Sequence, residues 1–185
     1  MNSRKIIRIL AVFLILSLTL CLCACTSKTT YANNLEVACN TMIIGCGQAE
    51  TLLHEILDVW NNSIYKVEDE NTDAYTKQDD GNGNFYEDFN DALSTLCADK
   101  AFSEKITELQ KNQSEVIPLM QSLKNPPKGY EEAYTSIVEF YDTYCGLTNL
   151  AITLNHGSYL SVSEDFKTLN NTCLQQYYKM QLYFG

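Results

Sequence analysis

The sequence has almost no arginine and only two histidines among its 185 residues. Arg4 and Arg8 are the only arginines, so the chain after residue 8 contains no guanidinium group, and the formal net charge is −10. Phosphate neutralisation by Lys and Arg supplies most nucleic-acid affinity, so this acidic composition argues against a nucleic-acid partner. Two imidazoles also leave few groups for acid–base catalysis near neutral pH. We therefore expect no enzymatic activity.

Long apolar runs are also absent, apart from residues 9–22. This run follows Arg4, Lys5 and Arg8, and a basic start before a short apolar core is typical of a secretory signal. At about 1.5 Å per residue, fourteen helical residues span roughly 21 Å, short of a hydrocarbon core about 30 Å thick. The run therefore favours a signal over a permanent transmembrane helix, which stays open as the alternative.

The stretch Leu22-Cys23-Ala24-Cys25 resembles the lipobox of bacterial lipoproteins. The resemblance implies that residues 1–24 are a lipoprotein signal peptide, cleaved between Ala24 and Cys25. It also implies a diacylglycerol on the Cys25 thiol and a place on the extracytoplasmic face of the cell membrane. Two acyl chains hold a domain on a bilayer where one chain is marginal. We expect no other cofactor; an ordinary signal or an uncleaved anchor is the alternative.

Cleavage there would leave 161 residues, enough for one domain, with a formal net charge of −13. Such a domain is not expected to lie flat on an anionic bilayer. The cysteines after Cys25 are five, an odd number that cannot all pair within one chain. Cys39 and Cys46 are seven residues apart, about 10.5 Å on one helix, too far for a disulfide. We interpret most of these thiols as small core residues, with long-range disulfides or metal binding as the alternatives. They are Cys39, Cys46, Cys97, Cys145 and Cys173.

The remaining chain shows helical periodicity and no convincing alternation of period two. Residues 25–33 are expected to be the lipidated cysteine and a tether, and residues 34–185 a helical bundle. In the first long helix the apolar residues recur at steps of three and four: Leu35, Cys39, Met42, Cys46, Ala49, Leu53, Ile56 and Trp60. The predicted helices span residues 34–66, 85–98, 99–124 and 130–154, and from Ser161 or Ser163 to the end. The sequence therefore predicts an all-α fold, an antiparallel bundle of four to five helices behind an N-terminal signal helix.

The segment from residue 125 onward begins Asn-Pro-Pro-Lys-Gly-Tyr-Glu-Glu-Ala-Tyr and has a Ser-rich entry to its last helix. It resembles the C-terminal part of uncharacterised helical lipoproteins of Gram-positive bacteria. The resemblance covers about a third of the chain and implies no known activity.

A first candidate metal site lies at Glu50, His54 and Asp58, which share a helix face at steps of four. The zinc motif HExxH needs a second histidine where this chain has Asp58. His54 also lies outside the apolar seam, so a solvated polar face is favoured over a metal site.

A second candidate lies at Asp80, Asn82 and Asn84, which resemble the start of a calcium loop. The calcium pattern requires Gly at its sixth position and Glu at its twelfth, where this chain has Phe85 and Asp91. A solvated acidic turn is therefore favoured, with calcium as the alternative.

Tyrosine is abundant: eight of the twelve tyrosines lie between residues 130 and 183. Half-exposed tyrosines give a large contact area at a low cost in side-chain entropy. The candidate ligand-binding residues flank the seams of the last two helices: Tyr130, Tyr134, Tyr141 and Tyr178. The alternative is that they fill the boundary layer of the bundle.

These observations predict a membrane-anchored, extracytoplasmic lipoprotein that binds an envelope protein, a peptide or a glycan without catalysis. One alternative is a metal-binding protein or metal-dependent enzyme that uses the two candidate metal sites. Another is an envelope-protection lipoprotein, for immunity or phage exclusion, which only size and anchor suggest.

Overall fold

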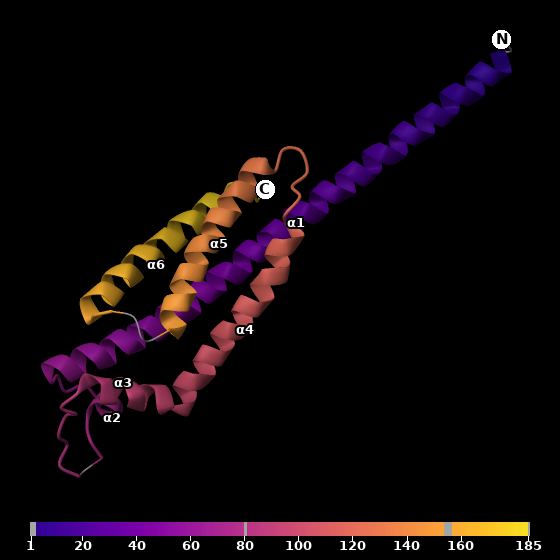
Figure 1. Cartoon of the computed structure of the whole chain (residues 1–185). Coiled ribbons are helices and arrows are strands. Elements are labelled where there is room, and N and C mark those ends of the chain that lie inside the picture. Colours follow the sequence, from indigo (N-terminus) through magenta and orange to yellow (C-terminus); the bar gives the residue numbers. More distant parts are fainter. Residues whose placement is uncertain (1–2, 80, 154–156, 185) are drawn as a thin grey trace.

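The computed structural model describes residues 3–79, 81–153 and 157–184, with side chains from residue 28 onward. The described residues form six helices and no strand, so the predicted all-α bundle is confirmed (Figure 1). A lone antiparallel backbone bridge joins Lys77 to Phe85. The helices are α1 (Ser3–Tyr65), α2 (Asp73–Thr76), α3 (Phe89–Ala98), α4 (Lys100–Ser122), α5 (Glu131–Ile152) and α6 (Tyr159–Gln181).

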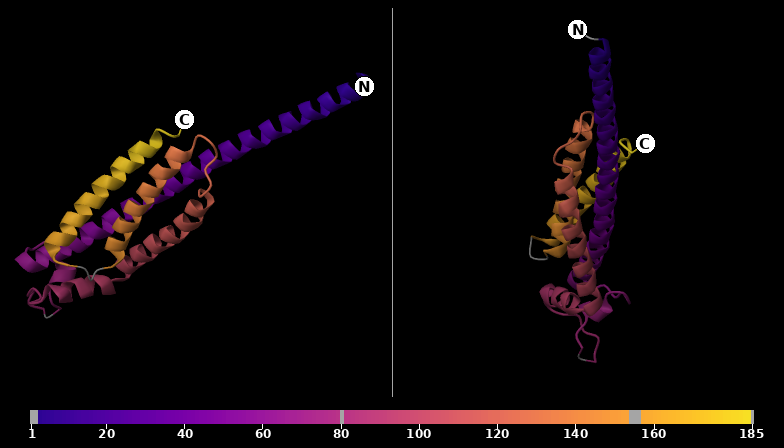
Figure 2. Two further views of the ribbon diagram at one scale, coloured as in Figure 1. Left: turned by 45° about the horizontal axis from the view of Figure 1, so that its top comes forward. Right: turned by 90° about the vertical axis from the view of Figure 1, so that its right-hand side faces the viewer.

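Helix α1 is the axis on which the other helices are assembled. It has 63 residues, and its N-terminal part projects beyond the bundle in every view (Figures 1 and 2). Helix α4 returns antiparallel to α1, α5 runs parallel to it, and α6 returns again. All eight residues of the seam predicted in α1 are buried. In the part of the chain whose side chains are described, no helix is long and apolar enough to cross a bilayer.

Residues 26–33 belong to α1, whereas the sequence predicted a polar tether followed by a helix from about residue 34. Tyr31 gives a physical reason, because its side chain is buried and its hydroxyl donates to the carbonyl of Leu123 at 3.1 Å. The ring also packs edge-on against Tyr130, with centroids 5.2 Å apart. These contacts of Tyr31 stabilise the helical conformation of residues 26–33, although the composition of that segment is typical of a linker.

The middle of α1 approaches α4 and α5 closely at Gly45. A Cβ atom added there would lie 2.7 Å from Cε2 of Tyr144 and closer still to Oδ1 of Asn112. Asn112 is buried, and its Nδ2 donates to the carbonyl of Thr41 at 3.0 Å. Its Oδ1 accepts a hydrogen bond from the Tyr144 hydroxyl at 2.7 Å. Three helices are thus joined by a satisfied buried polar group, which requires glycine at position 45.

Two helix starts differ from the prediction. Helix α3 begins at Phe89 instead of residue 85, because the N–H of Tyr86 donates to the Thr76 carbonyl, which keeps that segment extended. Helix α6 begins at Tyr159 because Ser158 and Ser161 cap each other's backbone N–H groups, instead of Ser161 pairing with residue 164. The predicted cap of α4 is confirmed: the Asp99 carboxylate accepts from the N–H of Phe102 at 2.9 Å.

The five cysteines after Cys25 are all unbonded thiols. Cys39, Cys46 and Cys173 are buried in the core, as expected for small hydrophobic residues. Cys145 is half-buried, and Cys97 is exposed on α3.

Candidate functional site

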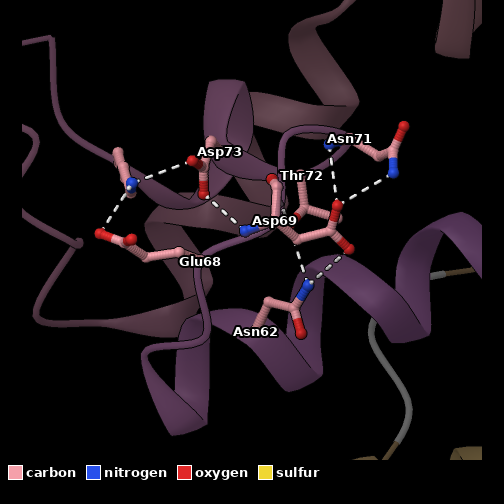
Figure 3. Close-up of polar contacts among 7 residues, drawn as sticks. Asn62, Glu68, Asp69, Asn71, Thr72 and Asp73 are labelled. Atoms are coloured by element: carbon pink, nitrogen blue, oxygen red, sulfur yellow. Dashed lines mark hydrogen bonds and ion pairs between the residues drawn. The ribbon is translucent and has the colours of Figure 1, made fainter.

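The chain between α1 and α3 folds into a polar elbow, residues 66–86, at the end of the bundle away from the N-terminus. The buried side chain of Asn62 closes it: Nδ2 donates to Thr72 Oγ1 at 2.9 Å and lies 3.5 Å from Asp69 Oδ2 (Figure 3). Asp69 also accepts from the N–H of Asn71 at 2.9 Å, and its own N–H donates to Asp73. These acidic residues are therefore occupied with the local backbone.

Lys66 and Lys77 are the two cations of the elbow, and Lys77 is the one that pairs with its acidic residues. Its ammonium lies 2.9 Å from Asp73 Oδ2, 3.4 Å from Glu68 Oε1 and 5.4 Å from the centre of the Phe85 ring. The hydrogen bond with Lys77 holds the pKa of Asp73 below its ordinary value, and the pKa of Lys77 is raised by the same bond. The predicted acidic break thus contains a specific ion-paired fold.

Asn82 and Asn84, the described residues of the candidate calcium loop, lie in this elbow. Gly81 and Gly83 have φ values of 74° and 71°, so the predicted turn is present. The side chains of Asn82 and Asn84 are exposed, and the Asn84 carbonyl accepts from the N–H of Gln78 at 2.7 Å. Asp80, the first predicted ligand, lies outside the described residues.

An acidic pocket of 220 Å³ lies beside the elbow, between α1 and the start of α4. Glu55 on its wall is ion-paired with Lys105, and Asp99 caps α4. Asp58, a candidate metal ligand, is exposed at its edge. Two of its three carboxylates therefore have structural partners. The lining is Glu55, Asp58, Val59, Asn71, Thr72, Tyr75, Leu96, Asp99, Ala101, Phe102 and Lys105.

The other candidate metal ligands lie one and two turns before Asp58. His54 Nε2 is 3.9 Å from Glu50 Oε1, and the imidazole packs edge-on against Phe166 with centroids 5.1 Å apart. Within the described residues, no group of three or more His, Cys, Asp or Glu side chains is placed to hold a metal ion. The histidine is therefore part of the contact between α1 and α6.

A groove of 290 Å³ separates α4 from α5 and contains two of the four candidate tyrosines, Tyr134 and Tyr141. The lining residues of each helix recur three or four positions apart, so one face of α4 forms one wall of the groove and one face of α5 forms the other. On the α4 side the exposed Ile117 is apolar, and Lys124 is the one charged residue of the lining. We call this feature the α4–α5 groove; it is lined by Ile117, Met120, Gln121, Lys124, Tyr134, Val138 and Tyr141.

Tyr141 on the α5 side of the groove is supported by an aromatic contact. Tyr141 stacks on the buried Tyr144 with centroids 6.2 Å apart and planes inclined by 25°. Burial raises the pKa of the Tyr141 phenol, and a hydrogen bond with Cys145 adds to this effect. The Tyr141 hydroxyl therefore stays protonated at neutral pH, and it donates its single proton to Cys145.

The other two candidate tyrosines lie elsewhere. Tyr130 packs on Tyr31 at the start of α5. Tyr178 is 67% exposed on α6, where it is tilted against Tyr177 with centroids 5.9 Å apart. The structure therefore places Tyr134 and Tyr141 in the groove lining, with Tyr130 one turn before Tyr134 but outside the lining and Tyr178 on another helix.

The sequence analysis did not identify the aliphatic part of the α4–α5 groove. Ile117 is an exposed apolar residue next to the α4 seam, and Val138 lies one turn after Tyr134 on α5. Their positions beside the two apolar seams are the only signal in the sequence, because neither helix by itself shows which helix it packs against.

A comparison of this chain with protein-family models, curated proteins and solved structures finds no significant match.

Proposed function

We propose that this chain is an extracytoplasmic lipoprotein, anchored through Cys25, that binds a peptide segment of a partner protein without catalysis. The site is the α4–α5 groove, where Tyr134 and Tyr141 face Ile117 across two helices. That arrangement is the observation on which the proposal rests, and the lipobox supports the location. The metal-binding and envelope-protection alternatives stay predictions.

The chemistry of the α4–α5 groove favours an apolar side chain of a peptide over a glycan. Ile117, Met120 and Val138 offer no hydrogen-bonding groups, so sugar hydroxyls placed against them would lose water without compensation. An aliphatic or aromatic side chain gains free energy from the same surface.

The polar groups of the α4–α5 groove suit a peptide backbone. The ammonium of Lys124 donates hydrogen bonds that a backbone carbonyl beside the inserted side chain accepts. The Tyr141 oxygen, whose proton goes to Cys145, accepts a hydrogen bond from a backbone N–H. A polyanionic ligand is disfavoured because the domain after Cys25 would carry a net charge of −13. We therefore expect a neutral or cationic peptide with one large apolar residue.

The anchor is tested by Cys25→Ala in the full chain, with Cys23→Ala as the matched thiol control. We expect the Cys25 variant alone to lose incorporation of labelled palmitate and to remain uncleaved. Fractionation, mass spectrometry and the label measure these effects. A cleaved, membrane-bound Cys25→Ala protein would contradict lipid attachment at this thiol.

The α4–α5 groove is tested by selecting a random-peptide library against the immobilised full chain. Selected peptides should carry a large apolar residue and should bind Ile117→Asp at least tenfold more weakly, because a charge would enter the apolar contact. Tyr178→Ala removes an exposed tyrosine outside the groove and should bind unchanged. Equal binding to Ile117→Asp, or failure to enrich any peptide, would count against this site.

A further inference from the structure

Helices α1 and α6 face each other in a fixed antiparallel register. Two ring contacts define it: His54 with Phe166 at 5.1 Å and Trp60 with Tyr159 at 6.0 Å. Because the helices run in opposite directions, the residue numbers of facing pairs add to a nearly constant value, here 220 and 219. Continued toward the middle of the bundle, this register places Cys173 opposite Cys46.

Both thiols lie in this interface. Cys46 is 2% exposed and Cys173 is fully buried. The Cys173 side chain is the largest cause of the raised pKa of the Cys46 thiol, so the two thiols are neighbours. Small side chains at facing positions allow two helices to approach closely, which an inter-helix disulfide requires.

The other described thiols do not compete for this pairing. Cys39 is two turns before Cys46 on the same helix, beyond the reach of a disulfide. Cys145 is hydrogen-bonded to Tyr141 on α5, and Cys97 is exposed on α3. Cys46 and Cys173 are therefore the two thiols placed to pair. One such pair leaves three of the five cysteines after Cys25 unpaired, as an odd number requires.

We propose that Cys46 and Cys173 form a disulfide that joins α1 to α6. The two thiols give up two protons and two electrons as the Sγ–Sγ bond forms. A disulfide-carrying oxidant, such as a thiol oxidoreductase or glutathione disulfide, accepts them and is reduced to two thiols. Formation of the bond in the cell rests on the proposed extracytoplasmic location, because cytosolic thiols are kept reduced.

The bond forms during folding, before α6 has docked. In the folded protein the hydrogen bond with Cys173 and burial raise the pKa of the Cys46 thiol far above its ordinary value. The thiolate is the species that attacks a disulfide, so exchange is slow once the pair is enclosed. The same burial then protects the finished bond from reductants.

The bond would link residues 127 positions apart in the chain. Closing so long a loop restricts the unfolded chain strongly, so reduction should lower the Tm of the oxidised protein by roughly 5–15 °C.

The test refolds the reduced, denatured full chain in detergent and a glutathione redox buffer, then blocks remaining thiols with iodoacetamide. Trypsin releases peptides 29–66 and 168–179, which contain Cys46 and Cys173. We expect mass spectrometry to find these two peptides linked. Cys39→Ala, which alters the other thiol of the first peptide, should keep the link, while Cys46→Ala and Cys173→Ala should lose it.

Recovery of both peptides separately alkylated after oxidative refolding would overturn the proposal, as would a link that Cys46→Ala retains. The Tm of the wild-type protein with and without reductant gives a measurement that needs no variant, and an unchanged Tm contradicts the bond. Protein taken from cells separates the two proposals. A pair that links on refolding but is reduced in cells supports the pairing and contradicts the location.

Discussion

The two ends of the bundle are held together in different ways. At the near end, beside the projecting part of α1, the rings of Tyr31 and Tyr130 pack together and Leu123 is fully buried. At the far end, Asn62 and its partners in the elbow form a network of hydrogen bonds and ion pairs. The near end therefore depends mainly on burial, and the far end mainly on polar geometry.

Charge follows the same division. Residues 61–105 carry eleven acidic residues and four lysines, a net charge of −7. At the near end, Lys124 and Lys128 lie in the loop between α4 and α5, and Lys28 lies on α1 nearby. Burial also raises the pKa of Tyr31 to about 12, so this ring stays neutral at physiological pH. The α4–α5 groove thus extends toward the less acidic end.

The largest effect is expected at the near end, from Leu123→Ala. Removing a fully buried leucine costs about 2–5 kcal/mol, which lowers the Tm by roughly 5–15 °C. Leu182→Ala is the control, because that leucine is 84% exposed and should change stability by less than about 0.5 kcal/mol. Thermal denaturation followed by circular dichroism measures both; equal effects would show that the near end does not depend on burial.

The second prediction concerns the point midway between the ends. Gly45→Ala should destabilise the fold by about 1–3 kcal/mol, because the methyl group would displace Asn112 or Tyr144. Gly47→Ala meets no neighbouring atom within 4 Å and should stabilise the helix by about 0.5–1 kcal/mol. Urea denaturation distinguishes the two, and a shift of the same sign in both variants would argue against the close approach.

A smaller effect is expected from Asn62→Ala at the far end. The change removes the buried hydrogen bond to Thr72 and costs about 1–2 kcal/mol. Asn71→Ala removes an exposed contact with Asp69 and should cost less than about 0.5 kcal/mol. Hydrogen exchange should show faster opening of the elbow in Asn62→Ala alone. Uniformly faster exchange over the whole chain would mean that the elbow does not open separately.

The smallest effect is the pH dependence of the ion pairs. The pKa of Asp73 is lowered on folding, so its stabilisation is present above its ordinary pKa of 3.8 and is lost as the pH falls through the folded value. The pKa of Lys77 is raised, so its contribution is present below 10.5 and is lost as the pH rises further. Both effects are small at this exposed site and weaken with salt.

Denaturation midpoints measured between pH 7 and pH 2 test this. Asp73→Asn should slightly reduce the loss of stability as the pH falls. Glu131→Gln is the near-end counterpart, because hydrogen bonds from the N–H groups of Glu131 and Gly129 lower the pKa of that carboxyl. A larger loss of stability at low pH in either variant would contradict the assigned direction of the pKa shift.

The sequence predicted the helices well wherever a seam is continuous. The eight predicted seam positions of α1 from Leu35 to Trp60 are buried, and Asp99 caps α4. These features are local, because periodicity and capping depend on residues a few positions apart. Tyr31 was missed because its partners, Leu123 and Tyr130, are about ninety to a hundred residues away.

The candidate site was predicted less completely for the same reason. Tyr134 and Tyr141 were identified because they flank the apolar seam of one helix, but Ile117 belongs to another helix and only packing places it opposite. His54 was assigned to a solvated face and is exposed there, but the sequence did not show that its ring also packs edge-on against Phe166 of α6. Short helix α2 carried no periodic signal, because four residues are too few to show one.

The unbroken course of α1 makes it a stiff stalk. With a lipid on Cys25, only six helical residues, about 9 Å, would separate the anchor from Tyr31. A flexible tether would let the domain take many positions above the membrane, whereas a continuous helix lets it only tilt about the anchor. Ile117 lies between the levels at which α4 contacts Tyr31 and Thr41, so the α4–α5 groove would stay roughly 15–20 Å from the anchor along the helix axis. Its partner would then have to present the peptide close to the membrane surface, in the juxtamembrane part of an envelope protein.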